Sequence, residues 1–284
     1  MQPKRFLTAP VRVVIPCVFS LGRYRKKLGK LEALTDKPTH YCQGCEHGEL
    51  TRLIASAIEN LGIRERTVMV DSVGCSVLAF DYFNIDHIQS PHGRAPAVAT
   101  GLKRVRPDLA VYTVQGDGDT LAIGLLEVMY AAIRGEPISV FLVNNAIYGM
   151  TGGQMAPTTM QGQVTTTTPY GRDIEFTGAP VDGSKLISTI DGSAYVKRVS
   201  LAVSELETPK GKTYSIKNIL EAKQAIENAF KVQMMGGFTF VECLSSCWVN
   251  WKLPIMEAKR FVNERLVKQY PLGTYKDKFG IEKK

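Results

Sequence analysis

Two continuous apolar runs, separated by a segment with helical periodicity, occupy the middle of the chain. The runs lie at residues 109–115 and 137–143, and apolar residues recur at helical spacing across residues 120–134. This order predicts a β-α-β unit, in which two buried parallel strands are joined by a crossover helix. Such units are typical of proteins that bind ligands outside the carboxyl ends of their strands. We therefore expect an α/β fold whose sheet is mostly parallel and carries helices on both faces.

Further elements are predicted on both sides of this unit. Apolar spacing indicates a helix at residues 49–61, where Gly62 is in position to cap the carboxyl end. The other expected elements are a strand at residues 66–71, a strand at 193–200, a helix at 215–232 and a final strand at 238–244. Together with the central unit they predict three layers, with the sheet between two layers of helices.

Composition divides the chain into three parts. Residues 1–38 are basic and contain four prolines, which predicts an irregular N-terminal arm. Residues 39–252 hold the predicted domain, and residues 253–284 form a charged C-terminal tail. Within the domain, residues 149–178 are rich in Gly, Thr, Gln and Pro. This stretch is too long for an ordinary connection, so we expect a functional loop.

The charge balance and the apolar stretches exclude several classes of protein. The 35 Lys and Arg residues exceed the 27 Asp and Glu residues, and the formal net charge of +8 favours acidic partners such as small electron carriers. No nucleic-acid partner is expected, because the basic residues are scattered apart from a group at residues 23–30. The apolar stretch at residues 11–21 is short and interrupted by Arg12 and Pro16, so we expect no signal peptide and no membrane partner. A cytoplasmic location follows, in which the six cysteines serve as thiols or metal ligands rather than in disulfides.

Oxygen-bearing side chains follow both central strands. Gly-Asp-Gly-Asp stands at residues 116–119, and Asn-Asn-Ala-Ile-Tyr-Gly stands at residues 144–149. Because parallel strands end at the same edge of a sheet, Asp117 and Asn145 are expected to share one hard cation such as Mg²⁺. The glycines allow close approach of a phosphate, and Asp119 is placed to cap the helix that follows. The simpler interpretation of each motif alone is an ordinary turn.

Four cysteines occupy positions where the strand ends and the first helix meet. Cys42 and Cys45 are two residues apart just before the predicted helix, while Cys75 and Cys247 each follow a predicted strand. Four thiolates at one edge fit either a structural zinc ion or a four-iron four-sulfur cluster. A redox dithiol at Cys42 and Cys45, with the other two as inert buried thiols, also agrees with the spacing.

Several motifs resemble those of a known enzyme family, over about residues 38–250. The Gly-Asp-Gly and Asn-Asn turns joined by one crossover helix resemble the thiamine diphosphate motif. Four further motifs look like the β subunit of 2-oxoacid:ferredoxin oxidoreductases: Tyr-Cys-Gln-Gly-Cys-Glu-His-Gly at residues 41–48, Val-Gly-Cys-Ser at 73–76, Ser-Pro-His-Gly-Arg-Ala at 90–95 and Tyr-Gly-Met-Thr-Gly-Gly-Gln at 148–154.

The resemblance implies a role for each matched residue. It implies that Mg²⁺ is held by the side chains of Asp117 and Asn145 and by the carbonyl of Ile147. Contacts to the cofactor are implied for Val73, Gly74, Cys75, Ser76, His92, Gly118, Asp119, Gly149 and Met150. It also implies that one [4Fe-4S] cluster is bound by Cys42, Cys45, Cys75 and Cys247, close to the thiazolium ring.

The chain departs from the family pattern near two of these cysteines. The family usually has Pro-Gly-Cys-Gly where this chain has Gln-Gly-Cys-Glu at residues 43–46, and a proline commonly precedes the fourth ligand where Ser246 stands. Cys17 and Cys243 have no counterpart in the pattern. Cys243 is a minor rival to Cys247 as the fourth ligand.

By resemblance, the activity is oxidative decarboxylation of a 2-oxoacid to acyl-CoA and CO₂, with electrons leaving through the cluster to ferredoxin. The implied partners are an α subunit that carries the pyrimidine-binding domain and the activating glutamate, ferredoxin, coenzyme A, and possible γ and δ ferredoxin-like subunits. The chain alone is expected to be inactive. The 2-oxoacid stays open, although residues 155–159 and 165–172 look most like the branched-chain and 2-oxoglutarate members. The alternatives are a non-redox thiamine diphosphate decarboxylase or ligase subunit and a zinc-binding structural subunit.

Overall fold

A computed structural model describes residues 31–208 and 211–283 of the chain. Cys17 and residues 1–30 of the predicted N-terminal arm lie outside the described residues. Residues 31–38 contain a turn and a single bridge between Leu34 and Phe83. The description below concerns the unit Leu31–Lys284.

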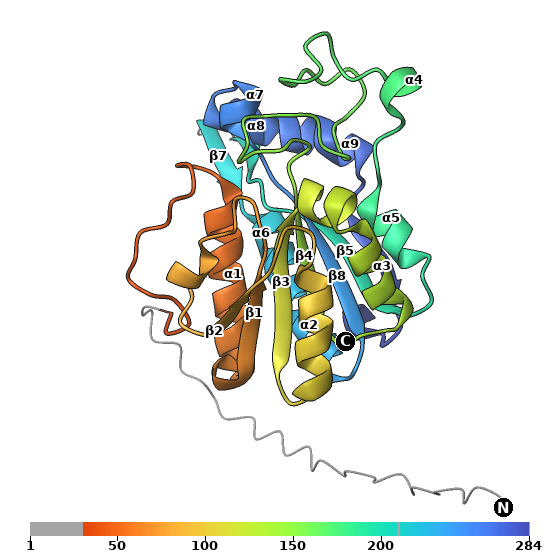
Figure 1. Cartoon of the computed structure of the whole chain (residues 1–284). Coiled ribbons are helices and arrows are strands. Elements are labelled where there is room, and N and C mark those ends of the chain that lie inside the picture. Colours follow the sequence, from red (N-terminus) through yellow and green to blue (C-terminus); the bar gives the residue numbers. More distant parts are fainter. Residues whose placement is uncertain (1–30, 209–210, 284) are drawn as a thin grey trace, which may run out of the picture. The chain divides into compact units, whose positions relative to one another are not determined.

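A seven-stranded sheet forms the centre of this unit (Figure 1). The strands are β1 (Thr67–Asp71), β2 (Asp86–Gln89), β3 (Ala110–Gly116), β4 (Ser139–Asn144), β5 (Ser193–Ser200), β8 (Phe238–Leu244) and β9 (Gly273–Asp277). Their order across the sheet is β2-β1-β3-β4-β8-β5-β9, and every pair is parallel except β5 with β9. The predicted mostly parallel α/β fold is confirmed.

Helices cover both faces of the sheet because its strands are apolar on both sides. One face packs against α1 (Glu46–Leu61) and α6 (Lys217–Met234), and the other against α2 (Ala95–Val105), α3 (Leu125–Ile133) and α5 (Gly183–Ser188). Neighbouring strand residues alternate between the two cores, as Met69 does with Val68 and Val70. Each buried aliphatic side chain contributes about 1.5–3 kcal/mol, so burial on both faces is the main force that holds these layers together.

The predicted crossover helix is divided into two elements. A π-helical turn, η3 (Asp119–Ile123), precedes Gly124, and α3 begins after it. A Cβ on Gly124 would lie 2.5 Å from the Asp119 carbonyl oxygen and 2.6 Å from the Gly93 carbonyl oxygen, so glycine is required where the turn packs against residue 93. π-Turns of this kind are frequent at functional sites.

The C-terminal tail belongs to the same unit as the sheet. It contains α8 (Ile255–Phe261), η4 (Val262–Leu266), α9 (Val267–Gln269), β9 and η5 (Ile281–Lys283). Because β9 pairs with β5, the boundary expected at residue 252 does not coincide with an edge of the fold. Val262, Leu266 and Tyr270 pack on Ala146 and Leu244, so the tail covers the carboxyl edge of the sheet.

The remaining elements are short. They are η1 (Arg64–Arg66), η2 (Ala79–Asp81), α4 (Ile174–Thr177), the hairpin β6 (Ser204–Thr208) and β7 (Gly211–Ser215), and α7 (Trp248–Trp251). Residues 149–178 are a long loop that ends in α4, in agreement with the prediction. Among the described residues, the helices are all too short or too polar to cross a membrane.

Candidate functional site

The site is built first from the ends of β3 and β4. These strands pair in parallel with Gly116 opposite Val143, so the turns that contain Asp117 and Asn145 leave the sheet side by side. Asp117 is buried, and its Oδ1 accepts a hydrogen bond of 2.8 Å from the Gly118 amide. Its Oδ2 accepts a bond of 2.5 Å from the hydroxyl of Thr158, in the long loop.

The electrostatics of this edge fit a hard cation. Burial raises the pKa of Asp117 to about 7, although hydrogen bonds from Thr158 and from the amides of residues 118, 147 and 146 act in the opposite direction. The Oδ1 atom of Asn145 is buried and has no hydrogen-bond partner among the described residues. A buried carboxylate and an unsatisfied amide oxygen beside it are the ligand types that Mg²⁺ prefers. The residues present therefore fit the expected ion.

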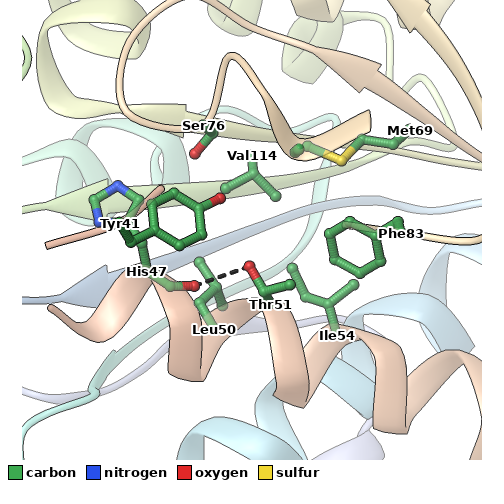
Figure 2. A pocket seen from close by; sticks show the side chains of 10 residues that line it. Tyr41, His47, Leu50, Thr51, Ile54, Met69, Ser76, Phe83 and Val114 are labelled. Atoms are coloured by element: carbon green, nitrogen blue, oxygen red, sulfur yellow. Dashed lines mark hydrogen bonds between the residues drawn. The ribbon is translucent and has the colours of Figure 1, made fainter. Parts of the chain in front are cut away.

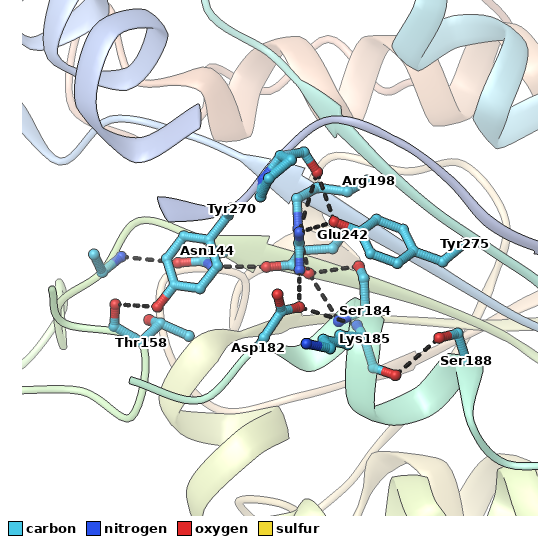
Figure 3. A network of polar contacts seen from close by, with 12 residues as sticks. Asn144, Thr158, Asp182, Ser184, Lys185, Ser188, Arg198, Glu242, Tyr270 and Tyr275 are labelled. Atoms are coloured by element: carbon cyan, nitrogen blue, oxygen red, sulfur yellow. Dashed lines mark hydrogen bonds and ion pairs between the residues drawn. The ribbon is translucent and has the colours of Figure 1, made fainter. Parts of the chain in front are cut away.

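A buried polar network shapes the second turn (Figure 3). The Asn144 side chain donates to Glu242 Oε1 over 2.7 Å, and its oxygen accepts from the Ala146 amide over 3.1 Å. Ala146 adopts a φ of 56°, which is uncommon for a residue other than glycine. Glu242 is wholly buried and accepts a bond of 2.9 Å from Arg198, which is also wholly buried. The network thus holds the turn that presents Asn145, and the sequence did not indicate Glu242 or Arg198.

The ring of Tyr148 covers the glycine of the first turn. A Cβ on Gly118 would lie 1.9 Å from the Tyr148 ring, so the ring packs directly on the glycine backbone. The charges of Asp117 and Asp119 add to the effect of burial in raising the pKa of Tyr148. Tyr148 was part of a quoted motif but had no predicted role.

Asp119 is engaged with the loop before α2 rather than with the helix. Its Oδ1 accepts from the Gly93 amide over 2.8 Å and also contacts His92 Nδ1, and its Oδ2 accepts from Gln115. It is the first residue of η3, which has no side-chain cap, so the expected capping role was wrong. The reason is that the carboxylate reaches the residue 92–93 turn instead. Asp119 therefore orients His92 at the carboxyl edge of β3.

The four expected cysteines gather at the same edge. Cys45 is the N-cap of α1, its amide donates to the Cys42 carbonyl over 2.9 Å, and Cys247 is the N-cap of α7. Cys75 lies in the turn after β1. Cys42 is exposed, and the other three are half-buried.

The cysteine thiols repel one another electrostatically when ionised. Burial raises the pKa of Cys45 to about 12, and the charges of Cys75 and Cys247 act in the same direction. Burial likewise raises the pKa of Cys75 to about 11, followed by the effects of Cys247, Cys42 and Asp117. Thiolates in such a place need a compensating positive charge, which bound metal would supply.

Gly149 lies between the turn that carries Asn145 and two of the cysteines. The position of a Cβ at Gly149 is 3.4 Å from Cys75 Sγ, 3.5 Å from Cys247 Sγ and 3.7 Å from Asn145 Nδ2. Asn250, which the sequence did not indicate, donates to the Gly149 carbonyl over 2.8 Å and to Cys247 Sγ over 3.2 Å. The two groups of side chains thus form one continuous site.

Cys243 and His47 are not among the expected ligands, and the structure places them differently. Cys243 is wholly buried in the core, where it pairs with Val143 and Val199 across the sheet. His47 lies 3.2 Å from Cys45 Sγ through Nδ1, and burial lowers its pKa to about 4. It is therefore a neutral neighbour of the cysteine.

A small internal cavity lies behind the cysteines (Figure 2). Among its lining residues are Tyr41, His47 and Ser76, and the others are mainly apolar side chains of α1, β1 and β3. Ser76 belongs to the expected cofactor-contacting set, whereas Val73 and Gly74 are half-exposed in the preceding turn and Met150 is exposed after Gly149. The cavity is thus a void in the packing beside the site.

Comparison with known proteins agrees with this geometry. The family model described as "Thiamine pyrophosphate enzyme, C-terminal TPP binding domain" matches residues 72–243. The ketoisovalerate oxidoreductase subunit VorA of Methanothermobacter thermautotrophicus is 45% identical over 241 residues, which are 84% of this chain and 48% of that protein. The 2-oxoglutarate synthase subunit KorB of Archaeoglobus fulgidus is 36% identical over 227 residues, which are 80% of this chain and 76% of that protein.

A solved structure has the same fold. The 2-oxoglutarate:ferredoxin oxidoreductase from Magnetococcus marinus, with 2-oxoglutarate, coenzyme A and succinyl-CoA bound, superposes with a TM-score of 0.70. Its sequence identity is 24%, and the match covers 89% of this chain and 87% of that one. The chain spans about half the length of the VorA relatives that it matches.

The sheet order, the paired turns and the matching family model define the class as a thiamine diphosphate-binding domain. Within that class, the chain belongs to the family of 2-oxoacid:ferredoxin oxidoreductase subunits, together with the VorA and KorB proteins.

Proposed function

We propose that this chain is the thiamine diphosphate- and iron-sulfur-binding β subunit of a 2-oxoacid:ferredoxin oxidoreductase. The complete enzyme converts a 2-oxoacid and coenzyme A to acyl-CoA and CO₂ and passes electrons through a [4Fe-4S] cluster to ferredoxin. The observation that carries the proposal is the contact at Gly149, where the Asp117–Asn145 site meets Cys75 and Cys247.

The residues of the first half of the site have distinct tasks in this function. Asp117, Asn145 and the Ile147 carbonyl would hold Mg²⁺, which when bound would supply positive charge for the diphosphate. Gly118, packed under the Tyr148 ring, and Gly149, beside the Cys75 and Cys247 sulfurs, would contact the diphosphate through their backbones. Met150 would lie beside it, and Asp119 holds the His92 ring toward the cofactor. The cofactor, when bound, supplies the electron sink for decarboxylation. The protein's part is to fix the diphosphate end, so that the reactive ring has one position.

The residues of the second half hold the electron acceptor. Cys42, Cys45, Cys75 and Cys247 bind the cluster, while Val73, Gly74 and Ser76 line the turn between the cluster and the cofactor. The contact through Gly149 keeps both groups at one edge of the sheet. A cluster bound there would supply an electron acceptor for the cofactor.

Membership of the 2-oxoacid:ferredoxin oxidoreductase family favours a cluster over a zinc ion, and the cysteine geometry is compatible with one. Within residues 31–208 and 211–283, no three His, Cys, Asp or Glu side chains are close enough together to hold one metal ion. Four thiolates on a single zinc ion would each lie about 2.3 Å from it. In a four-iron cluster each cysteine binds a different iron, so the sulfurs are more widely spaced. The non-redox alternative is disfavoured because it gives no role to four cysteines gathered beside the cofactor turn.

An apolar surface supports the need for a partner chain. Ile123, Leu126, Tyr130 and Ile133 recur at helical spacing along η3 and α3, and their exposed fractions lie between 46% and 64%. This stripe begins four residues after Asp119, at the diphosphate turn. A chain that packs on the stripe would reach the cofactor. We assign it to an α subunit whose pyrimidine-binding domain supplies the activating glutamate, because large exposed apolar stripes mark protein interfaces.

The substrate and the electron carrier complete the proposal. The 45% identity to a ketoisovalerate oxidoreductase subunit favours a branched-chain 2-oxoacid, with 2-oxoglutarate second. The net charge of +8 suits an acidic ferredoxin, and γ and δ ferredoxin-like subunits would carry any relay clusters. A cytoplasmic location suits the oxygen-sensitive cluster and the reduced cysteines.

Metal and cofactor content test this proposal. The chain is co-expressed with its α subunit and purified without oxygen, and iron, zinc, magnesium and thiamine diphosphate are measured. We expect brown protein with about four irons per chain and one thiamine diphosphate, and activity that is highest with a branched-chain 2-oxoacid. Colourless protein that contains only zinc would overturn the cluster, and iron-loaded protein that never retains thiamine diphosphate would overturn the cofactor site.

A further inference from the structure

Glu46 links two of the cysteine-bearing segments. It is the first residue of α1, directly after Cys45, and only 2% of it is exposed. Its Oε2 atom accepts hydrogen bonds from the Ser246 amide over 3.0 Å and from the Ser246 hydroxyl over 2.6 Å. Ser246 immediately precedes Cys247. The carboxylate therefore connects the segments on either side of the site, which are 200 residues apart in the chain.

Lys259 of α8 completes this link. Its ammonium group is 2.9 Å from Glu46 Oε1 and 3.3 Å from the carbonyl oxygen of Gly44, which lies between Cys42 and Cys45. The Lys259 side chain is 15% exposed, so the ion pair is largely shielded from water. Gly44 itself has a φ of 79° and packs on Ile255 of the same helix. Through Lys259 and Ile255, the C-terminal tail thus holds the Cys42–Cys45 segment in place.

Glu46 and Ser246 are also two of the three positions at which the motifs of this chain depart from the family pattern, the third being Gln43. Glycine at the first position has no side chain, and proline at the second has no N–H to donate. Neither bond of this pair can form with those residues. The structure brings the two departures into direct contact, so they act as one unit.

We propose that Glu46, held by Ser246 and Lys259, is a positioning residue that fixes the Cys42–Cys45 segment to the Cys247 segment and sets the reduction potential of the cluster. The proposal rests on the proposed function, since it requires the cluster. The potential of such a cluster depends on nearby charge, on hydrogen bonding and on solvent exposure. In this buried place one negative and one positive charge are balanced, and removal of either leaves the other unpaired beside the cluster.

The test is the midpoint potential of the cluster in the purified complex, followed by the electron paramagnetic resonance signal of the reduced form. For Glu46→Gln we expect a higher potential, because an unpaired ammonium favours the added electron. For Lys259→Met we expect a lower potential, because an unpaired carboxylate disfavours it. The double variant is expected to return toward the wild-type value, since both charges leave together. Glu65→Gln, exposed just before the amino end of β1 and so at the opposite edge of the sheet, serves as the control and should leave the potential unchanged.

The outcomes separate this inference from the proposed function. A wild-type complex without a cluster would overturn both. A wild-type complex with about four irons per chain, and variants whose potentials are unchanged or move in the same direction, would overturn only the role of Glu46. If Glu46→Gln fails to retain iron, Lys259→Met alone decides, and an unchanged potential in that variant contradicts the proposal.

Discussion

At the scale of single residues, Asp117 is central because its carboxylate is buried, and this burial raises its pKa to about 7. The Asp117→Asn variant removes the negative ligand while it keeps the shape of the side chain. We expect the complex to lose bound Mg²⁺ and thiamine diphosphate, as measured by calorimetry. The cofactor-free chain should become more thermostable, because burial of an ionised carboxylate opposes folding.

Asp108→Asn is the matched control for this substitution. Asp108 is exposed beside Arg106, at the amino end of β3 and so at the opposite edge of the sheet from the site, and its loss should leave cofactor binding unchanged. If Asp117→Asn binds Mg²⁺ and the cofactor as tightly as the wild type does, the magnesium site has been assigned to the wrong residue.

Arg172 has a structural role in the long loop. It is 4% exposed, and its guanidinium donates to the carbonyl oxygens of Ala156, Pro157, Thr159, Gly178 and Ala179. The loop thereby places Thr158 on Asp117. Arg172→Met should weaken thiamine diphosphate binding by about 10–100-fold, as expected for loss of an outer-shell support. Amide hydrogen exchange in residues 149–178 should become faster, whereas Arg106→Met should change neither measurement.

At the scale of elements, the buried Arg198–Glu242 pair fastens β5, β8 and the tail together. Arg198 also donates to the Pro271 carbonyl and contacts Asp182 and Tyr275, so β5, β8, the turn before α5 and the tail meet at this point (Figure 3). Removal of one partner leaves the other charge buried and costs about 3–5 kcal/mol. Glu242→Gln should therefore lower the free energy of unfolding by about this amount. Denaturant unfolding checks it, with the exposed Glu221→Gln as the control that should change little.

Elements with strong apolar patterns were predictable from the sequence. The strands at residues 193–200 and 238–244 were predicted with the observed bounds, because buried apolar residues recur through both of them. The edge strand β2 was missed because its side chains are mostly exposed, and β9 was missed because it is charged and gains its position only by pairing with β5. Local pattern is a poor guide where tertiary pairing decides.

The candidate site was predictable only in part, for the same reason. Asp117, Asn145 and the four cysteines carry recognisable motifs, and the structure brings them to one edge. Thr158, Glu242 and Asn250 belong to no motif. Each contacts a site residue that is at least 41 positions away in the chain. Such partners cannot be found before the fold is known.

At the scale of the whole molecule, the exposed stripe on α3 is expected to be covered in the active enzyme. Leu126→Asp places a charge in the middle of that surface without touching the core of this chain. We expect the variant to fold normally but to lose its α subunit in size-exclusion chromatography, and activity should fall with the fraction of complex. Val105→Asp, at the carboxyl end of α2 and more exposed than Leu126, should assemble as the wild type does. Normal assembly of Leu126→Asp would place the partner on another face.

The central claim is that the cofactor and the cluster on this chain exchange electrons directly. The most direct measurement mixes the oxygen-free complex with its 2-oxoacid, freezes it, and records the electron paramagnetic resonance spectrum without any added reductant. We predict that a reduced-cluster signal appears together with CO₂ and increases when coenzyme A is present. Release of CO₂ by an iron-loaded complex whose cluster stays oxidised would contradict it.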